Sequence, residues 1–316
     1  MFTPEITLPS FAKVNLSLHI LGKRPDGYHE VVTVLQSVSL HDQLHFLGRK
    51  DERLVLTCSS DEVPTDETNL VIRAARLLSG KYQLHRGANI HIEKRIPPGV
   101  GLGGASSNAA IALLALARLW NLDVNLLQLI EMGSELGSDV PFFFFGGRAA
   151  GTGTGTKVTS ISDSPALDLL IVTPKAKVST AEAYSALKDT ALTTTNSVFI
   201  LPSSHAEEFL RNSIQWPLHN DFESVIFEIE PEIERVQKAL LGTGARDVLL
   251  AGSGSSVFGI FDSAEARQHA LDEIKAEAGW RVFPCSTLSR REYVQALGSC
   301  GATLLRSGIT RFDSGA

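Results

Sequence analysis

The chain has 316 residues, 43% of them hydrophobic, and a formal net charge of −6. That length allows about two domains, and an acidic chain without a dense basic block argues against nucleic acid as a partner. The longest apolar stretch, residues 109–119, is interrupted by Arg118 and is shorter than the ~20 residues of a membrane span.

The net charge also constrains how an anion could be bound. Positive charge would have to come from a few local side chains, against the sign of the whole molecule. The candidates along the chain are Lys13, Lys23, Arg24, Lys94 and Arg95.

Targeting, disulfide and zinc signals are weak in this sequence. The N-terminus lacks the pattern of a secretory signal or transit peptide, so we expect a cytoplasmic protein. Cys58, Cys285 and Cys300 are widely spaced and form no CxxC pair, which favours neither a disulfide framework nor a zinc site. His41 and His45 are four residues apart, but their stretch reads as turn and strand. We therefore expect no metal bound by the protein alone.

The first predicted element is a strand. Apolar and polar residues alternate from Ala12 to Ile20, which predicts a half-buried strand with Lys13, Asn15 and Ser17 on one face. A turn-rich loop at residues 22–29 follows it.

The other elements alternate between both types, so we expect an α+β fold. Strands are predicted at residues 31–38, 43–46, 53–57, 88–93 and 168–172; helices at 69–78, 107–120, 124–136 and 233–240; and a strand, glycine loop and strand at 247–261. We predict domains at residues 1–160 and 161–297, followed by a weakly structured tail at 298–316.

The most informative stretch is the glycine loop Pro97–Asn108, which runs directly into the predicted helix at 107–120. Glycines let backbone N–H groups converge, and a helix N-terminus adds unpaired donors and partial positive charge, so this junction suits a phosphate group. Ser106 and Ser107 either cap the helix or meet a phosphate and its Mg²⁺. From the residues alone, an ordinary glycine turn with a serine cap remains an alternative.

Two common nucleotide-binding motifs do not explain this loop. Gly99, Gly101 and Gly104 fit GxGxxG, but the helix that follows leads into another helical pattern instead of a strand that ends in an acid. The P-loop motif GxxxxGK[ST] is absent from the sequence.

The loop resembles the phosphate-binding motif of the GHMP kinases. Pro9–Leu16 is similar to the first motif of that superfamily and Ala251–Phe258 to its third, which packs against the nucleotide loop. Arg24–Glu30, Asp66–Val71 and Leu136–Phe142 resemble the diphosphocytidyl-methylerythritol kinases in particular.

The resemblance extends from Pro9 to about Leu288, and the sequence departs from the family's motifs in two loops. A glutamate that is frequent in the family is missing from Gly151–Gly155, and Gly254–Ser256 stands where the third motif usually has Gly-Pro-Thr.

The resemblance implies a two-domain fold with the active site in the cleft between the domains. It implies ATP-dependent phosphorylation of the 2-hydroxyl of diphosphocytidyl-methylerythritol in the non-mevalonate isoprenoid pathway, by a monomer or homodimer. Asp139 would accept the proton of the hydroxyl, and Lys13 would orient it and stabilise charge. Without the family, Asp139 would read as a turn residue and Lys13 as an exposed strand residue.

The resemblance also implies a set of binding residues. Mg²⁺ would arrive with ATP, with help from Ser107. Asn69 fits a helix N-cap equally well. The ATP set is Asn69, Lys94, Pro97, Gly99, Gly101, Leu102, Gly103, Gly104, Ala105, Ser106, Ser107 and Asn108. The acceptor set is Asn15, Tyr28, His29 and Tyr184, of which the last three would embrace the cytosine. Asn220–Glu223 resembles a family motif with an architectural role.

Two alternatives remain at this level. Another GHMP kinase, of the homoserine or mevalonate type, would share the glycine loop but not the Tyr28-His29 segment. A catalytically inactive ATP-binding regulatory protein would share the fold, but the presence of both Lys13 and Asp139 argues against it.

Overall fold

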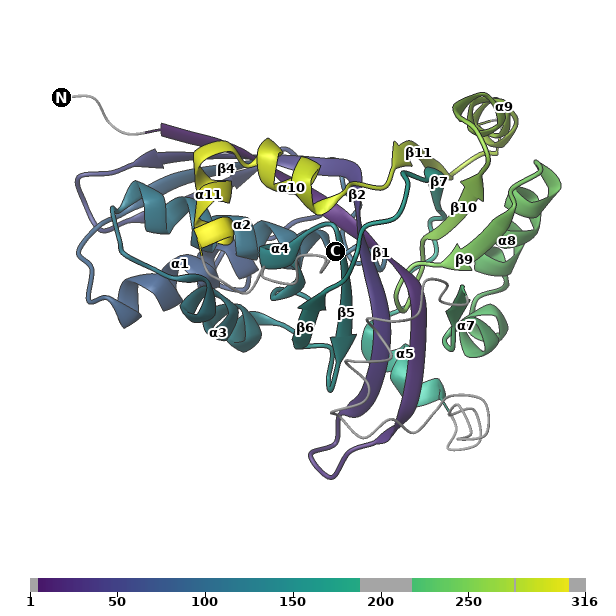
Figure 1. The fold of residues 1–316 in the computed structure, drawn as a ribbon, viewed down its shortest axis with the longest axis horizontal. Helices are drawn as coiled ribbons and strands as arrows, with labels where there is room; N and C mark the ends of the chain where they lie inside the picture. Colours follow the sequence, from purple (N-terminus) through teal and green to yellow (C-terminus); the bar gives the residue numbers. More distant parts are fainter. Residues whose placement is uncertain (1–4, 188–217, 276, 307–316) are drawn as a thin grey trace, which may run out of the picture.

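The computed structural model describes residues 5–187, 218–275 and 277–306 and contains two sheets with helices packed on them (Figure 1). The first sheet has the order β3-β4-β2-β1-β8, with β5 paired to β2 and β6 paired to β5. Its strands are β1 (Glu5–Lys23), β2 (His29–Gly48), β3 (Leu54–Cys58), β4 (Ala88–Glu93), β5 (Arg148–Thr152), β6 (Lys157–Ser160) and β8 (His219–Asn220). This mixture of helix and strand confirms the α+β class.

The second sheet lies beside the first and has the order β11-β7-β10-β9, with every pair antiparallel. Its strands are β7 (Asp168–Thr173), β9 (Asp247–Leu250), β10 (Val257–Phe261) and β11 (Arg281–Ser286). The predicted domain boundary at residues 160 and 161 falls between β6 of the first sheet and β7, the first strand of the second sheet. The boundary itself stays a prediction, since β8 returns to the first sheet.

Helices cover both sheets. The first sheet carries α1 (Leu70–Lys81), α2 (Gly104–Leu119), α3 (Leu126–Leu136) and α4 (Phe142–Phe145), and the second packs against α8 (Pro231–Gly242) and α9 (Ala264–Ile274). The remaining helices are α5 (Thr180–Ala186), α7 (Glu223–Ile229), α10 (Arg290–Ala296) and α11 (Gly298–Arg306). Within the described residues, no helix is both long and apolar enough to span a membrane.

The long antiparallel hairpin of β1 and β2 runs through the whole molecule and joins its two halves (Figure 1). The predicted strand at 12–20 is the middle of β1, but the expectation that it is half-buried is wrong: both faces are buried from Phe11 to Ile20. Ala12, Val14 and Leu16 pack against the second sheet in one apolar cluster. A strand held between two packed layers has no face left for solvent.

A β-bulge in β1 shows that the predicted grouping of Lys13, Asn15 and Ser17 on one face of the strand is wrong. The register with β2 shifts between Asn15 and Ser17, so one extra residue is inserted and the alternation of side chains reverses. Lys13 and Asn15 therefore share a face with Leu18 instead of Ser17. The alternation seen in the sequence could not reveal this reversal.

The C-terminal segment is more ordered than expected. Residues 298–306 form α11, which packs with α10 on the first core (Figure 1), so the predicted weak structure is wrong there; residues 307–316 lie outside the described part. Tyr293 of α10 is fully buried and its hydroxyl donates to the Phe143 carbonyl at 2.6 Å. Leu297, Cys300 and Leu304 are buried at helical spacing, a signal already present in the sequence.

We predict that Leu304→Ala lowers the free energy of unfolding by about 2–5 kcal/mol, because it removes buried apolar contacts and leaves a cavity. Leu241→Ala is the matched control, since Leu241 lies on α8 with half its surface exposed and should change that energy by less than about 0.5 kcal/mol. Urea unfolding measures both. Equal, small effects would mean that α11 does not contribute to the core.

Candidate active site

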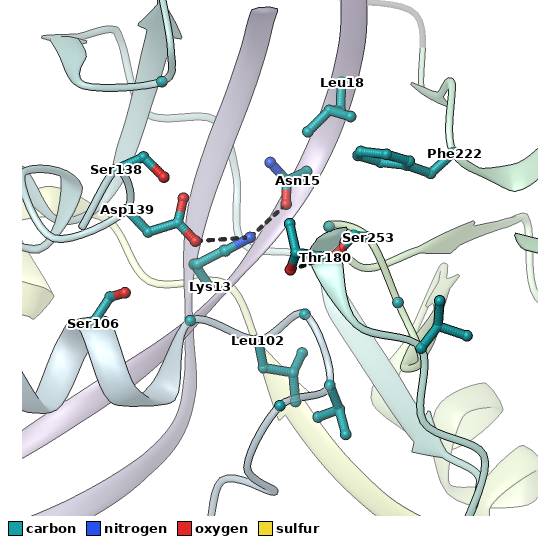
Figure 2. A pocket seen from close by; sticks show the side chains of 18 of the residues that line it. Lys13, Asn15, Leu18, Leu102, Ser106, Ser138, Asp139, Thr180, Phe222 and Ser253 are labelled. Carbon is teal, nitrogen blue, oxygen red and sulfur yellow. Dashed lines mark hydrogen bonds and ion pairs between the residues drawn. The ribbon is translucent and has the colours of Figure 1, made fainter. Parts of the chain in front are cut away.

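A cavity of about 660 Å³ lies between the β1–β2 hairpin, the N-terminus of α2 and the second half of the chain (Figure 2). The glycine loop, α5 and the 252–254 turn complete its wall. Among the lining residues are Lys13, Asn15, Leu18, Pro97, Gly99, Gly101, Leu102, Gly103, Gly104, Ala105, Ser106, Ser138, Asp139, Thr154, Thr180, Tyr184, Phe222 and Ser253. Most residues predicted from the sequence therefore meet in one place.

Lys13 is the buried cation of this cavity. Its Nζ donates to Asn15 Oδ1 at 2.8 Å and lies 3.5 Å from Asp139 Oδ2 (Figure 2). Only 4% of the Lys13 side chain is exposed, whereas 38% of the Asp139 side chain is. The ammonium is thus held by the protein, and the carboxylate stays open to a ligand.

A directed chain of hydrogen bonds fixes the orientation of Asn15. Its Nδ2 donates to Thr33 Oγ1 at 2.8 Å, and the Thr33 hydroxyl donates to the Ser17 carbonyl at 2.7 Å. Because the hydroxyl proton is used by Ser17, Thr33 can only accept from Asn15, and the amide must turn its oxygen toward Lys13. This chain holds the lysine in place before any ligand binds.

The glycine loop packs closely on two neighbours. Lys13 N donates to Leu102 O at 3.0 Å, and Ser256 N donates to Val100 O at 3.2 Å, so the third motif does pack against the loop. A Cβ on Gly101 would lie 1.9 Å from Ala251 O. The glycine is required there because backbone occupies the space of a side chain.

The N-terminus of α2 opens at this cavity. The helix begins at Gly104 with Gly103 as its N-cap, and no side chain in the described structure caps it, so of the two alternatives for the serines the helix cap is wrong. Ser106 lines the cavity (Figure 2). Ser107 is fully buried behind it and accepts a hydrogen bond from Ser10 Oγ at 2.8 Å. The unpaired N–H groups of the helix are thereby left for a ligand.

Two predicted ATP residues lie beneath the loop. Lys94 forms a buried ion pair with Asp42, and Asn108 Nδ2 donates to Asp42 Oδ2 at 2.9 Å. The Arg95 and Ile96 backbone N–H groups donate to the other Asp42 oxygen, each at 2.8 Å. Asp42 therefore anchors the start of the loop to β2. Sequence reasoning missed this residue, which falls between the strands predicted at 31–38 and 43–46, whereas β2 is continuous in the structure.

Asn69 is the N-cap of α1. Its Oδ1 accepts from Val71 N at 2.8 Å, and its Nδ2 donates to Pro64 O at 2.6 Å. Of the two interpretations drawn from the sequence, the structure shows the cap, and the side chain lies away from the cavity wall.

Aromatic side chains form the end of the cavity away from the glycine loop. Tyr184 stacks on His29 with ring centroids 4.7 Å apart, and its edge meets Phe222 at 4.9 Å. Burial, reinforced by the Asp139 charge, raises the pKa of Tyr184 to about 12, so the phenol stays neutral at physiological pH. Phe222 was missed, although it lies inside the Asn220–Glu223 motif.

Tyr28 lies at the entrance. About two thirds of its surface is exposed, and it lines a second hollow of about 980 Å³ together with His29 and Tyr184. That hollow shares Tyr184 and Thr180 with the 660 Å³ cavity, so the two adjoin. The structure brings Tyr28, His29 and Tyr184 together as the sequence predicted.

The Asn220–Glu223 motif supports the cavity wall from behind. Asn220 Nδ2 donates to the Leu250 and Gly252 carbonyls, each at 2.8 Å, and Asn220 Oδ1 accepts from Phe222 N at 3.0 Å. The architectural role expected of this motif agrees with these bonds. The two departing loops also reach the cavity, through Thr154 and Gly254.

We predict that Gly101→Ala disrupts the loop far more than Gly99→Ala. Both glycines have positive φ, so each alanine pays about 1–2 kcal/mol of backbone strain. Only at position 101 does the new Cβ also overlap the Ala251 carbonyl, while no described atom lies within 4 Å of it at position 99. Melting temperature and ATP affinity measure the difference. Equal losses in both variants would contradict the close packing.

Comparisons with known proteins agree with this geometry. The family model "GHMP kinases N terminal domain" matches residues 69–147, and "GHMP kinases C terminal" matches residues 204–279. A 4-diphosphocytidyl-2-C-methyl-D-erythritol kinase from Syntrophotalea carbinolica is 37% identical over 274 residues, which is 86% of this chain and 95% of that protein.

Solved kinase structures also match this chain. A crystal structure of 4-(cytidine 5'-diphospho)-2C-methyl-D-erythritol kinase matches with a TM-score of 0.74 and 32% identity, covering 89% of this chain and 99% of that one. A homoserine kinase from Cytophaga hutchinsonii matches with a TM-score of 0.64 but only 18% identity, covering 92% and 96%, and so shares the fold alone. The chain belongs to the GHMP kinases, and within them to the 4-diphosphocytidyl-2-C-methyl-D-erythritol kinase family.

Proposed function

We propose that this kinase transfers the γ-phosphoryl group of ATP to the 2-hydroxyl of 4-diphosphocytidyl-2-C-methyl-D-erythritol, a step in isoprenoid precursor synthesis. Family membership supports ATP as the donor, and the names of the relatives support the acceptor. The observation that carries the mechanism is the placement of Lys13 and Asp139, 3.5 Å apart, at the cavity into which the N-terminus of α2 opens.

The glycine loop and α2 would hold the phosphates of ATP. Residues 103–106 line the cavity at the start of α2, where backbone N–H groups have no intrahelical partners and the helix dipole adds partial positive charge. These donors are fixed by the packing of Gly101 on Ala251, so they need no reorganisation when charge develops on the transferred group.

Asp139 would accept the proton of the acceptor hydroxyl. Its carboxylate is more than one third exposed, and its 3.5 Å contact with Lys13 is longer than a strong charged hydrogen bond, so lone pairs remain for a substrate. Lys13 would attract both the carboxylate and the transferred phosphoryl group. Such alignment of nucleophile and phosphorus, with electrostatic stabilisation, accounts for most of the catalysis in phosphoryl transfer.

Mg²⁺ would be held largely by ATP oxygens. The donor set fits this ion, because the cavity offers the hydroxyls of Ser106 and Ser138 and the Asp139 carboxylate, all oxygen atoms. When bound, the ion neutralises phosphate charge. Ser107, which the resemblance placed in this role, is fully buried and bonded to Ser10, so Ser106 is the better candidate.

The aromatic end of the cavity would bind the cytosine. Tyr184 already stacks on a flat ring, that of His29, and Tyr28 stands exposed at the entrance beside it. A base could replace His29 on the Tyr184 face and gain stacking energy. This end distinguishes the proposed acceptor from homoserine or mevalonate, which have no ring to stack.

We predict that Asp139→Asn lowers kcat by roughly 10²-fold or more, the typical contribution of a general base, while ATP affinity stays nearly unchanged. Lys13→Met should likewise reduce kcat more than it raises KM for ATP. The control is Asp123→Asn, an exposed acid just beyond the other end of α2, which should behave as wild type. Near-normal turnover of Asp139→Asn in a coupled ADP-release assay would remove Asp139 from the mechanism.

We also predict that Tyr184→Ala and Tyr28→Ala raise KM for the acceptor by roughly 5- to 150-fold, the equivalent of one base–aromatic stack, and leave KM for ATP unchanged. Tyr184→Phe keeps the ring and should retain wild-type acceptor affinity. Free methylerythritol phosphate, which lacks the cytidine, should lose kcat as well as affinity. Equal use of both acceptors by wild type would refute cytosine recognition without touching the role of Asp139.

A further inference from the structure

Three metal-ligating side chains meet outside the cavity, where β8 joins β1. They are His19 of β1, His219 of β8 and Asp221 just after β8. One ring nitrogen from each histidine and one carboxylate oxygen all lie within 4.8 Å of one another. The segments are about 200 residues apart in the chain, so only the fold brings these groups together.

His19 carries the first sign of an incomplete site. Only 7% of its surface is exposed, and its Nδ1 is buried without a hydrogen-bond partner in the described part of the chain. Leaving a buried polar atom unpaired costs folding free energy. A ligand that accepts an electron pair from this ring would remove that cost.

Asp221 is held in position for a ligand role. Its Oδ2 accepts from the Ile20 backbone N–H at 2.6 Å, which fixes the carboxylate against β1. Its Oδ1 lies 2.6 Å from His219 Nε2. On metal binding, this contact between Asp221 and His219 would give way to a bond from each of the two side chains to the ion.

His219 is the most exposed of the three side chains. Its ring stacks on that of His19 with centroids 4.9 Å apart, and 47% of its side chain is exposed. Donor atoms around a tetrahedral Zn²⁺ lie roughly 3.3 Å from one another, as bond lengths of about 2.0–2.1 Å require. The three donor atoms now lie within 4.8 Å of one another, and the half-exposed His219 ring is the member of the three with most room to move toward an ion.

We propose that His19, His219 and Asp221 form a binding site for a divalent transition-metal ion of the zinc type. Two imidazole nitrogens and one carboxylate oxygen are the donors such ions prefer, and the exposed side of His219 leaves a fourth position for water. Mg²⁺ prefers six oxygen ligands, so two imidazole nitrogens and one carboxylate oxygen suit it poorly. The site is therefore distinct from the Mg²⁺ that accompanies ATP.

A bound ion would join two strands that otherwise share little. β8 has two residues and pairs in parallel with β1 through Ser17–His219 and Leu18–Asn220. The ligands at positions 219 and 221 flank Asn220, whose amide holds the 250–252 backbone, and precede Phe222, which lines the cavity. The ion would thus stiffen the wall of the acceptor end of the cavity.

The test is calorimetric titration of ZnCl₂ into tag-free, EDTA-treated and dialysed protein, with Mg²⁺ in large excess. We expect one ion per chain, a rise in melting temperature with zinc, and visible absorption from Co²⁺ bound in its place. His219→Ala and Asp221→Asn should each weaken binding by at least about tenfold. His269→Ala is the matched control, because that histidine pairs with Glu273 on α9 and should leave binding unchanged.

His219 is the decisive position, since its half-exposed ring can be removed without opening the core. Circular dichroism and the melting temperature in EDTA confirm that each variant is folded. The proposal is overturned if wild type binds no zinc beyond the level of His219→Ala, or if His219→Ala and His269→Ala bind it with equal affinity.

Discussion

The structure depends on one close approach, that of the glycine loop to the backbone around it. Gly101 lies against the Ala251 carbonyl, and Gly103 lies against the Lys13 side chain, at distances that admit no side chain. This contact places the N-terminus of α2 beside Lys13 and links it to the second half of the chain. The strand, the helix and the turn do not form a site individually. Because Gly101 and Gly103 carry no Cβ, these elements pack closely enough for a phosphate to lie near the Lys13 ammonium and the Asp139 carboxylate.

The net charge of −6 makes the local arrangement of cations important. Of the five basic residues considered as candidates, three are paired away from the cavity: Arg24 with Asp26 and Glu30, Lys94 with Asp42, and Arg95 with Glu93. Lys23 lines the outer hollow, and so does Arg24. Lys13 is the one of the five at the 660 Å³ cavity, which the exposed Lys177, paired with Glu62, also lines, so attraction of an anion there combines these two ammonium groups with the helix N-terminus.

The sequence predicted the motifs well because each is a local pattern with a local cause. The glycine loop, its helix and the Asp139 turn are contiguous, and the structure places all of them as expected. What the sequence could not predict depends on neighbours from distant segments. Lys13 looked exposed until the second sheet covered β1, and the bulge after Asn15 moved Ser17 away from the site.

The same reasoning explains what else the sequence did not reveal. The role of Lys94 in ATP binding stays a prediction, but its buried ion pair with Asp42 comes from a distant strand and could not be foreseen. The tail looked weakly structured because glycine and serine dilute its apolar residues. Its buried positions become evident only when a surface, here the first core around Phe143, exists to receive them. In both cases the outcome depends on a contact with a distant part of the chain, which the local sequence pattern does not contain.

A short path of contacts connects the two ends of the cavity. Tyr184 and Thr180 are on the same helix, and the Thr180 hydroxyl lies 3.0 Å from Ser253 Oγ. The residue before Ser253, Gly252, approaches so closely that a Cβ there would lie 3.2 Å from Lys13 Nζ. A group bound against Tyr184 would therefore contact the helix that also meets the turn bordering the lysine. Under the proposed function, this path of contacts would let the binding energy of the remote cytosine contribute to aligning the reacting hydroxyl.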